Sequence, residues 1–375
     1  MNKTSLLLLI TISSIFIFSV YKGTEDENHQ VKFNKNYAIF SPNQPDEIIF
    51  SGEKMPLEQA DINERFDKEL LVNTYWQSQT ILFIKKAHKY FPIIEPILKE
   101  EGIPEDFKYL AIAESGLANI VSPSGATGFW QIMKATAKEQ GLQINNEVDE
   151  RYHLLKSTKA ACNYLNEAYL KFGSWTLAAA AYNMGMTGLE KQLKRQNVFN
   201  YYDLLLNNET ARYIFRISAI KEILTHQKTY GFQIREKDLY TLPPLKKVLL
   251  DSSVINFANY ATELNINYKI LKEYNPWLRQ AELNNETNVA YLVTFPEEGY
   301  YTSENKTEIV NPEHTIDRIH KIDTLKIICS ETSLLKNIAK ENEIDLEELF
   351  LQNIDVLDLK VKKGQELKFI KESKL

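Results

Sequence analysis

A glutamate at the end of an apolar, helix-patterned stretch is the residue best placed for acid–base chemistry. Glu114 follows the run Tyr109-Leu-Ala-Ile-Ala and is followed by Ser115 and Gly116. Glycine commonly ends a helix, so Glu114 should lie in a last helical turn. The negative end of the helix dipole and burial both disfavour a charged carboxylate, which predicts a raised pKa. A carboxyl group that stays protonated near neutral pH can donate a proton to a glycosidic oxygen.

Three further clusters follow, each with polar side chains beside glycine, alanine or a helix start. The first is the turn-rich loop 122–131, the second is the alanine-rich stretch 175–185, and the third is Glu209-Thr-Ala-Arg-Tyr213. Taken singly, they are compatible with a turn, a tightly packed helix and the start of an amphipathic helix. The polar groups that they offer are Gln131, Tyr182, Asn183 and Tyr213.

In this order and spacing the clusters resemble the lysozyme-like catalytic domain of the lytic murein transglycosylases, the soluble-lytic-transglycosylase family. The matching motifs are Glu114-Ser115, Gly128-Phe129-Trp130-Gln131, Ala181-Tyr182-Asn183 and Tyr213. The resemblance covers about residues 65–230 and is greatest to the membrane-bound transglycosylase D type, in which lysin motifs follow this domain. The second motif departs from the family's Gly-Leu-Met-Gln by having Phe-Trp, which affects groove shape more than chemistry.

The resemblance implies non-hydrolytic cleavage of the β-1,4 bond between N-acetylmuramic acid and N-acetylglucosamine. Glu114 would be the acid and then the base, giving 1,6-anhydro-N-acetylmuramic acid ends. By the same resemblance, five residues would bind substrate or steer the carboxyl group. These are Ser115, Gln131, Tyr182, Asn183 and Tyr213.

Two alternatives remain open from the residues themselves. A hydrolytic muramidase would need a second carboxylate beside the bond, and Asp149, Glu150 and Glu209 are conceivable candidates. All three are explained more simply as acids at the starts of helices. The other alternative is a peptidoglycan-binding protein without catalysis, although such a protein would be expected to have lost Glu114 or its polar neighbours.

Composition narrows the choice of partners. The net charge of −6, from 44 basic and 50 acidic side chains, argues against nucleic acid. The two cysteines, Cys162 and Cys329, fall in different regions and are expected to be isolated buried thiols. The six histidines are scattered without metal-ligand spacing, so no metal or cofactor is predicted. The partner that the resemblance implies is the glycan strand of peptidoglycan.

The beginning of the chain indicates export. Lys3 precedes an apolar run from Leu6 to Val20, typical of a signal peptide and short for a spanning helix. Residues 1–22 are therefore predicted to be a signal peptide or a retained N-terminal membrane anchor, and the protein to lie in the periplasm or cell envelope. Residues 23–60 have little periodicity and are interpreted as a linker and an irregular lead-in.

Helical periodicity dominates residues 61–235, which are assigned to the catalytic domain with an N-terminal helical wrap. Ile62, Phe66 and Leu70 begin a long pattern that is expected to break before Pro92. Further helices are expected at about 127–140, 153–172, 175–184, 186–195 and 209–227. Within them, His153 is interpreted as a core or helix-face residue rather than a catalyst.

The last third changes pattern after Pro243-Pro244 and contains a repeat 78 residues apart. Apolar residues and an asparagine recur at identical spacing, which predicts a duplicated unit. The pairs are Phe257 and Leu335, Ala261 and Ala339, Ile266 and Ile344, Leu271 and Leu349, and Asn275 and Asn353. Both copies, residues 245–298 and 320–372, resemble degenerate lysin motifs, which are βααβ modules. The predicted fold class is therefore mainly α, with a lysozyme-like helical domain followed by small α+β modules.

Overall fold

The computed structural model describes residues 41–286, 289–297, 323–342, 344, 349, 360–361 and 363–371. The chain divides into two compact units, residues 1–300 and 301–375. The predicted signal or anchor, residues 1–22, lies outside the described residues. Within the part of the chain that is described, no helix has both the length and the apolar character needed to cross a membrane.

A helical domain forms the larger part of the first unit. It opens with a short antiparallel pair, β1 (Ile49–Phe50) and β2 (Glu53–Lys54). The α-helices that follow are α2 (Ala60–Tyr75), α3 (Gln77–Glu100), α4 (Lys108–Ser115), α5 (Lys134–Glu139), α6 (Leu154–Phe172), α7 (Trp175–Met184), α8 (Met186–Gln196) and α9 (Asn208–Thr225). Short 3-10 turns, η1 (Glu105–Phe107) and η2 (Glu150–Tyr152), precede α4 and α6, and a third, η3 (Glu236–Asp238), follows α9.

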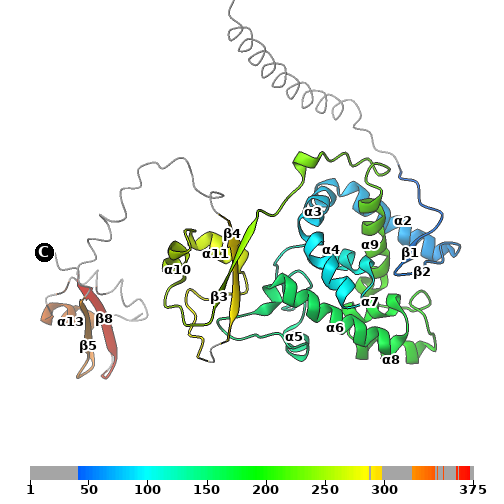
Figure 1. Ribbon diagram of the computed structural model, residues 1–375. Helices are drawn as coiled ribbons and strands as arrows, with labels where there is room; N and C mark the ends of the chain where they lie inside the picture. The colour runs from blue at the N-terminus through cyan, green and yellow to red at the C-terminus, as the bar shows by residue number, and fades with distance from the viewer. Residues whose placement is uncertain are drawn as a thin grey trace, which may run out of the picture. The chain divides into compact units, whose positions relative to one another are not determined.

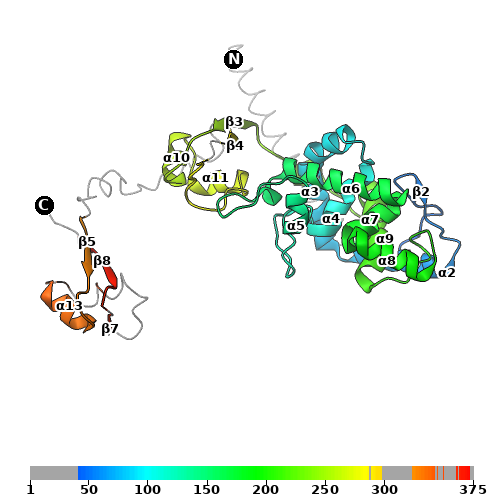
Figure 2. The ribbon, with the colours of Figure 1, turned by 90° about the horizontal axis from the view of Figure 1, so that it is seen from below.

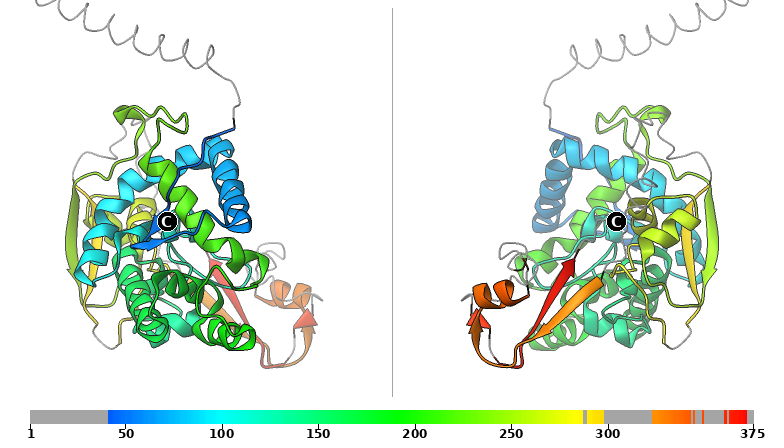
Figure 3. Two further views of the ribbon diagram at one scale, coloured as in Figure 1. Left: turned by 90° about the vertical axis from the view of Figure 1, so that its right-hand side faces the viewer. Right: turned by 90° about the vertical axis from the view of Figure 1, so that its left-hand side faces the viewer.

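The short helix α4 lies inside this domain and is surrounded by longer helices (Figure 1). It packs against α9 and α3, while α7 packs against α6 and α9. Every residue of α4 from Lys108 to Ala113 is buried. The helix α2, at the start of this domain, lies along α9 (Figure 3). The core therefore fixes the position of the last turn of α4, which carries Glu114.

The expected helix break before Pro92 is wrong. The helix α3 runs through both Pro92 and Pro96. A proline inside a helix costs about 3 kcal/mol because it removes a hydrogen bond and crowds the preceding turn. After Pro92, however, α3 buries Ile94, Ile97 and Leu98 in the core, and each such side chain contributes about 1.5–3 kcal/mol. Tertiary burial is large enough to offset the local cost.

The expected helix at 127–140 is present only in its second part, because α5 begins at Lys134. The backbone explains the difference. Gly128 and Gln131 have φ of 84° and 47°, values that a right-handed helix does not allow. Instead, Thr127 forms isolated β-bridges with Val121 and Ile132. The segment that carries Gln131 is therefore a folded loop, hereafter the 120–132 loop.

A small α+β module completes the first unit, as the repeat predicted. Its elements are β3 (Leu245–Leu250), α10 (Phe257–Glu263), α11 (Tyr268–Tyr274) and β4 (Tyr291–Pro296). The strands β3 and β4 pair antiparallel, with α10 and α11 beside them (Figure 2). Asn275 is fully buried, and its side chain exchanges hydrogen bonds of 2.8 and 2.7 Å with the backbone of Thr294 in β4. The repeated asparagine thus joins the helical half of the module to its sheet.

The second unit contains β5 (Asp323–Ile328), β6 (Ser333–Leu334), α13 (Leu335–Glu341), β7 (Lys360–Val361) and β8 (Glu366–Lys371). The strand β5 pairs antiparallel with β8, and β6 with β7. Leu335, Ala339 and Leu349 are buried, as their repeat partners are in the first module. The last predicted repeat residue, Asn353, lies outside the described residues.

Candidate active site

Glu114 occupies the last turn of α4, as predicted. Gly116 ends the helix in the left-handed conformation, with φ of 59°. The Glu114 side chain is half-buried, and one carboxylate oxygen, Oε1, accepts a hydrogen bond from the hydroxyl of Tyr213. Burial raises the pKa of Glu114 to about 7, opposed by this hydrogen bond and by Arg216 and reinforced by Glu209. The group therefore exchanges protons near neutral pH.

The hydroxyl of Tyr213 points from α9 to α4 across the core of the domain. Tyr213 is 4% exposed, and its burial, followed by the charge of Glu114, holds its pKa well above the usual value. The phenol therefore keeps its proton and acts as a hydrogen-bond donor. This contact joins two motifs that lie 99 residues apart in the chain.

Tyr182, on α7, attaches the 120–132 loop to the same region. Its hydroxyl donates to the backbone oxygen of Trp130 at 2.7 Å. Burial, and then the charge of Glu114, raises the pKa of Tyr182 well above its normal value. Ser115 makes a second attachment, because its hydroxyl donates to the backbone oxygen of Phe129 at 2.7 Å. In this structure Ser115 therefore holds the loop to α4.

The two residues that depart from the family motif fill the core. Trp130 is fully buried and donates its indole N–H to Thr158 Oγ1 at 2.8 Å. Phe129 is 5% exposed and packs edge-on against Tyr90, with ring centroids 4.8 Å apart. Both residues therefore pack in the core of the helical domain.

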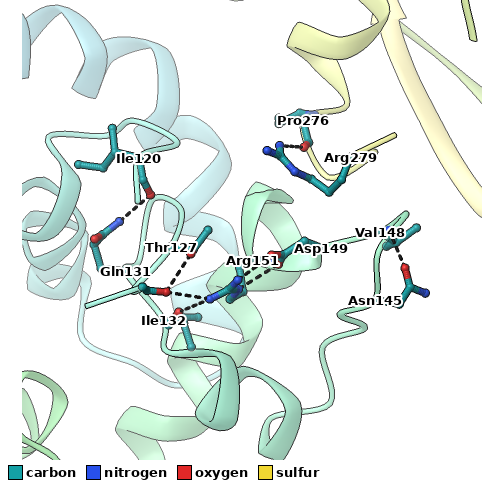
Figure 4. A network of polar contacts seen from close by, with 11 residues as sticks. Ile120, Thr127, Gln131, Ile132, Asn145, Val148, Asp149, Arg151, Pro276 and Arg279 are labelled. Atoms are coloured by element: carbon teal, nitrogen blue, oxygen red, sulfur yellow. Dashed lines mark hydrogen bonds and ion pairs between the residues drawn. The ribbon is translucent and has the colours of Figure 1, made fainter. Parts of the chain in front are cut away.

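Gln131 remains partly exposed on the loop. Its side-chain nitrogen, Nε2, donates to the backbone oxygen of Gly128 at 2.8 Å. The same nitrogen donates to the backbone oxygen of Ile120 at 3.0 Å (Figure 4). These two bonds keep Gln131 in its left-handed backbone conformation. The amide nitrogen of Gln131 is therefore used within the loop.

Asn183, at the end of α7, is held by the first turn of α9. Its amide nitrogen donates to Glu209 Oε1 at 3.0 Å, and its amide oxygen accepts from Thr210 Oγ1 at 2.6 Å. The sequence explained Glu209 as an ordinary acid of a helix start. The structure adds that it orients Asn183 and, by its charge, raises the pKa of Glu114. The sequence did contain a signal for this role, because Glu209 lies four residues, or about one helical turn, before Tyr213.

The other conceivable second acids are engaged elsewhere. The carboxylate of Asp149 forms a bidentate pair with Arg151 at 3.0 and 2.7 Å. Glu150 accepts from the backbone nitrogen of Gln143 at 2.8 Å and pairs with Lys156. The helix α6 begins only at Leu154, so both acids serve the preceding turn rather than the start of a long helix.

Two family models match segments of this chain. Residues 91–205 match the model of the transglycosylase SLT domain, and these residues contain Glu114, the 120–132 loop, Tyr182 and Asn183. This chain carries a transglycosylase SLT domain. Residues 246–299 match the soluble lytic transglycosylase C-terminal LysM-like domain, which coincides with the module from β3 to β4. The lysozyme-like helical domain and a lysin-motif-like module are thus both present.

Curated proteins with similar sequences include lytic murein transglycosylases. The chain is 30% identical over 237 residues to membrane-bound lytic murein transglycosylase D of Escherichia coli strain K12, covering 61% of this chain and 51% of that protein. The same values hold for the protein of that name from strain O6:H1. A putative tributyltin chloride resistance protein of Alteromonas sp. is 31% identical over 102 residues, which cover 27% of this chain and 49% of that protein. The chain thus spans about half the length of the curated relatives that it matches.

Proposed function

We propose that the protein is a lytic transglycosylase of peptidoglycan, with Glu114 as its general acid and then its base. The observation that carries the proposal is the half-buried carboxyl group of Glu114, whose pKa of about 7 is set by burial and by the Tyr213 hydroxyl. General acid catalysis is most efficient when the pKa lies near the working pH. The SLT domain and the resemblance to membrane-bound lytic murein transglycosylase D support the substrate class.

The proposed reaction uses one carboxyl group twice. Glu114 gives its proton to the glycosidic oxygen as the bond between that oxygen and C1 of N-acetylmuramic acid breaks. The resulting carboxylate then takes the proton of the C6 hydroxyl, whose oxygen bonds to C1 and closes the 1,6-anhydro ring. The proton count on Glu114 is restored, and no water is consumed. The tyrosine hydroxyl of Tyr213 stabilises the carboxylate between the two steps.

The arrangement favours this reaction over hydrolysis. A hydrolytic muramidase needs a second carboxylate as base or nucleophile. Glu209 is bonded to Asn183, Asp149 to Arg151, and the remaining candidate, Glu150, to Lys156. In the same proposal the oxygen of Gln131 and the oriented amide of Asn183 bind N-acetyl groups, and Ser115 and Tyr182 hold the loop that closes the site.

The protein is proposed to act outside the cytoplasm, where its substrate is found, after export directed by residues 1–22. Membrane attachment through the same residues is part of this proposal. The module at 246–299 is proposed to bind glycan strands, as its LysM-like match suggests.

The test is digestion of purified sacculi by the full chain and by its Glu114→Gln variant. We expect the variant to release soluble muropeptides at least about a hundredfold more slowly, the usual size of a general acid's contribution, and still to pellet with sacculi. Glu139→Gln, which changes an exposed glutamate at the end of α5, is the matched control. Undiminished release by Glu114→Gln would refute the assignment, and pelleting without release by the parent chain would favour a binding protein.

A further inference from the structure

The LysM-like module is joined to the helical domain through a segment close to the 120–132 loop. The backbone nitrogen of Asp149 donates to Trp277 O at 2.9 Å, and that of Arg279 donates to Glu147 O at 2.7 Å. Between them, Val148 forms a β-bridge with Leu278 and is fully buried in the core of the module. The helical domain therefore contributes one strand-like segment, residues 147–149, to the module.

Side chains reinforce this junction. The hydroxyl of Tyr291 in β4 exchanges hydrogen bonds of 2.9 and 3.1 Å with the side-chain amide of Gln143. The guanidinium of Arg279 lies over the ring of Tyr152, 4.0 Å from its centroid. The backbone of Gln143 is in turn bonded to Glu150, by its nitrogen to the carboxylate and by its oxygen to the backbone nitrogen. The module thus holds both ends of the segment that precedes Arg151.

Arg151 connects this segment to the 120–132 loop. Its guanidinium forms the bidentate pair with Asp149, and its Nη1 atom donates to the backbone oxygens of Gly125 at 3.0 Å and Ile132 at 3.4 Å. Figure 4 shows Arg151 between Asp149 and the loop residues around Ile132. Both charged side chains are almost completely buried, with 10% and 11% exposed. A planar five-donor group is needed to make all of these bonds at once.

The loop also rests directly on the backbone of Arg151. A Cβ atom added to Gly128 would lie 2.1 Å from Arg151 O, so the loop approaches the 151 backbone as closely as glycine allows. Gly128 O is one of the two acceptors of the Gln131 side chain. A shift of Arg151 must therefore shift the backbone that holds Gln131.

We propose that Arg151 is a positioning residue for glycan cleavage, and that the LysM-like module holds it in place through Asp149 and Gln143. The module then has a second role besides contact with glycan: it is a structural support of the substrate loop. This inference rests on the proposed function and deepens it.

The first test is a double-mutant cycle on the full chain that combines Arg151→Lys with Gln131→Ala. Lysine keeps the charge but has no planar fork with which to bind Asp149 and two carbonyl groups. We expect Arg151→Lys to lower kcat/KM for sacculi about tenfold, and to cause less than about a twofold further loss when Gln131 is already replaced. The pH dependence of kcat/KM should not move, because the charges acting on Glu114 are those of Arg216 and Glu209.

A merely structural role predicts a different result. In that case Arg151→Lys lowers the melting temperature and the folded fraction, and its effect multiplies with that of Gln131→Ala. Such independent losses would overturn the proposal. Arg235→Lys, which alters a comparable pair with Asp238 after α9, is the matched control and should leave kcat/KM unchanged.

The part played by the module is tested by Tyr291→Phe, which removes the hydroxyl bonded to Gln143. We expect kcat/KM to fall about threefold. Tyr260→Phe is the control, because the buried hydroxyl of Tyr260 in the same module has no hydrogen-bond partner among the residues that the structure describes. Equal activities of the two variants would overturn the coupling of module and loop, and this comparison remains available if Arg151→Lys fails to fold.

Failure of the proposed function is recognised separately, because the parent chain would then release no products. The Arg151 and Gln131 cycle is in that case measured as affinity for the hexamer of N-acetylglucosamine. Non-additive losses of affinity would support the positioning role of Arg151, and additive losses would overturn it.

Discussion

The Tyr213 hydroxyl should set the pH at which Glu114 loses its proton. It donates to the carboxyl oxygen Oε1 and lowers the pKa of Glu114, whereas burial raises this pKa more strongly; the net pKa is about 7. A hydrogen bond to a charged group contributes about 1.5–3 kcal/mol, and one pKa unit corresponds to about 1.4 kcal/mol. Tyr213→Phe should therefore raise the pKa of Glu114 by about one to two units, to between about 8 and 9.

The assay is the pH profile of kcat/KM for the release of soluble muropeptides. The protonated form of Glu114 starts the reaction, so kcat/KM falls as the pH rises through its pKa. In the parent chain this fall should centre near pH 7. In Tyr213→Phe it should move to higher pH, even if the maximal rate is lower because the carboxylate formed during the reaction has lost a donor.

The control is Tyr202→Phe, since the hydroxyl of Tyr202 is buried and has no hydrogen-bond partner within the described part of the chain. It removes the same atom from the same core and should leave the pH profile unchanged. An alkaline limb that stays in place in Tyr213→Phe, or that moves to lower pH, would refute the assignment of this limb to Glu114 and of Tyr213 as its donor.

Three further predictions concern stability. Gly128→Ala should lower the free energy of unfolding in urea by more than about 2 kcal/mol, because the added Cβ would meet the carbonyl oxygen of Arg151 at 2.1 Å. Gly125→Ala is the control: Gly125 has a similar φ of 85° and open space around it, so the loss should be about 1 kcal/mol. Equal losses would contradict the close approach of Gly128 to Arg151. Burial lowers the pKa of His153 from 6.5 to about 4, so the unfolded chain binds more protons between these values, and about 1.5 kcal/mol of stability should be lost from pH 6.5 to pH 5. A His153→Asn variant with the same pH dependence would show that other groups are responsible. Asn275→Ala should cost about 1–3 kcal/mol, because it leaves backbone groups of β4 unpaired, and hydrogen exchange confined to the module should report it.

Much of the helical framework follows from local signals in the sequence. The ends of α4 and α6 were predictable because Gly116 and Gly173 adopt the left-handed conformation that ends a helix. The first module was visible as a repeat, because Phe257 and Leu271 must both enter one small core. Such features depend on the spacing of apolar residues and on glycines at positions with a positive φ, and both can be read from the sequence directly.

Other features depend on tertiary contacts that no local pattern encodes. The helix α3 continues through Pro92 because burial beyond it offsets a local penalty, and the 120–132 loop replaces a helix because Gly128 rests on the Arg151 backbone. The roles of Glu209 and Arg151 were missed for the same reason. From the sequence, Glu209 is explained as an acid at a helix start and Arg151 as half of an ordinary ion pair. Only the fold shows that Glu209 also bonds to Asn183 and that Arg151 also bonds to the 120–132 loop.

The central claim is that one carboxyl group cleaves the glycan without water, and the mass of the products tests it most directly. Sacculi are digested by the full chain in water enriched in ¹⁸O, and the released muropeptides are weighed by mass spectrometry. The account predicts 1,6-anhydro-N-acetylmuramic acid ends that are lighter by one water than hydrolytic products and carry no ¹⁸O. Reducing ends that have taken up ¹⁸O during cleavage would contradict it and would require a second carboxylate at the site.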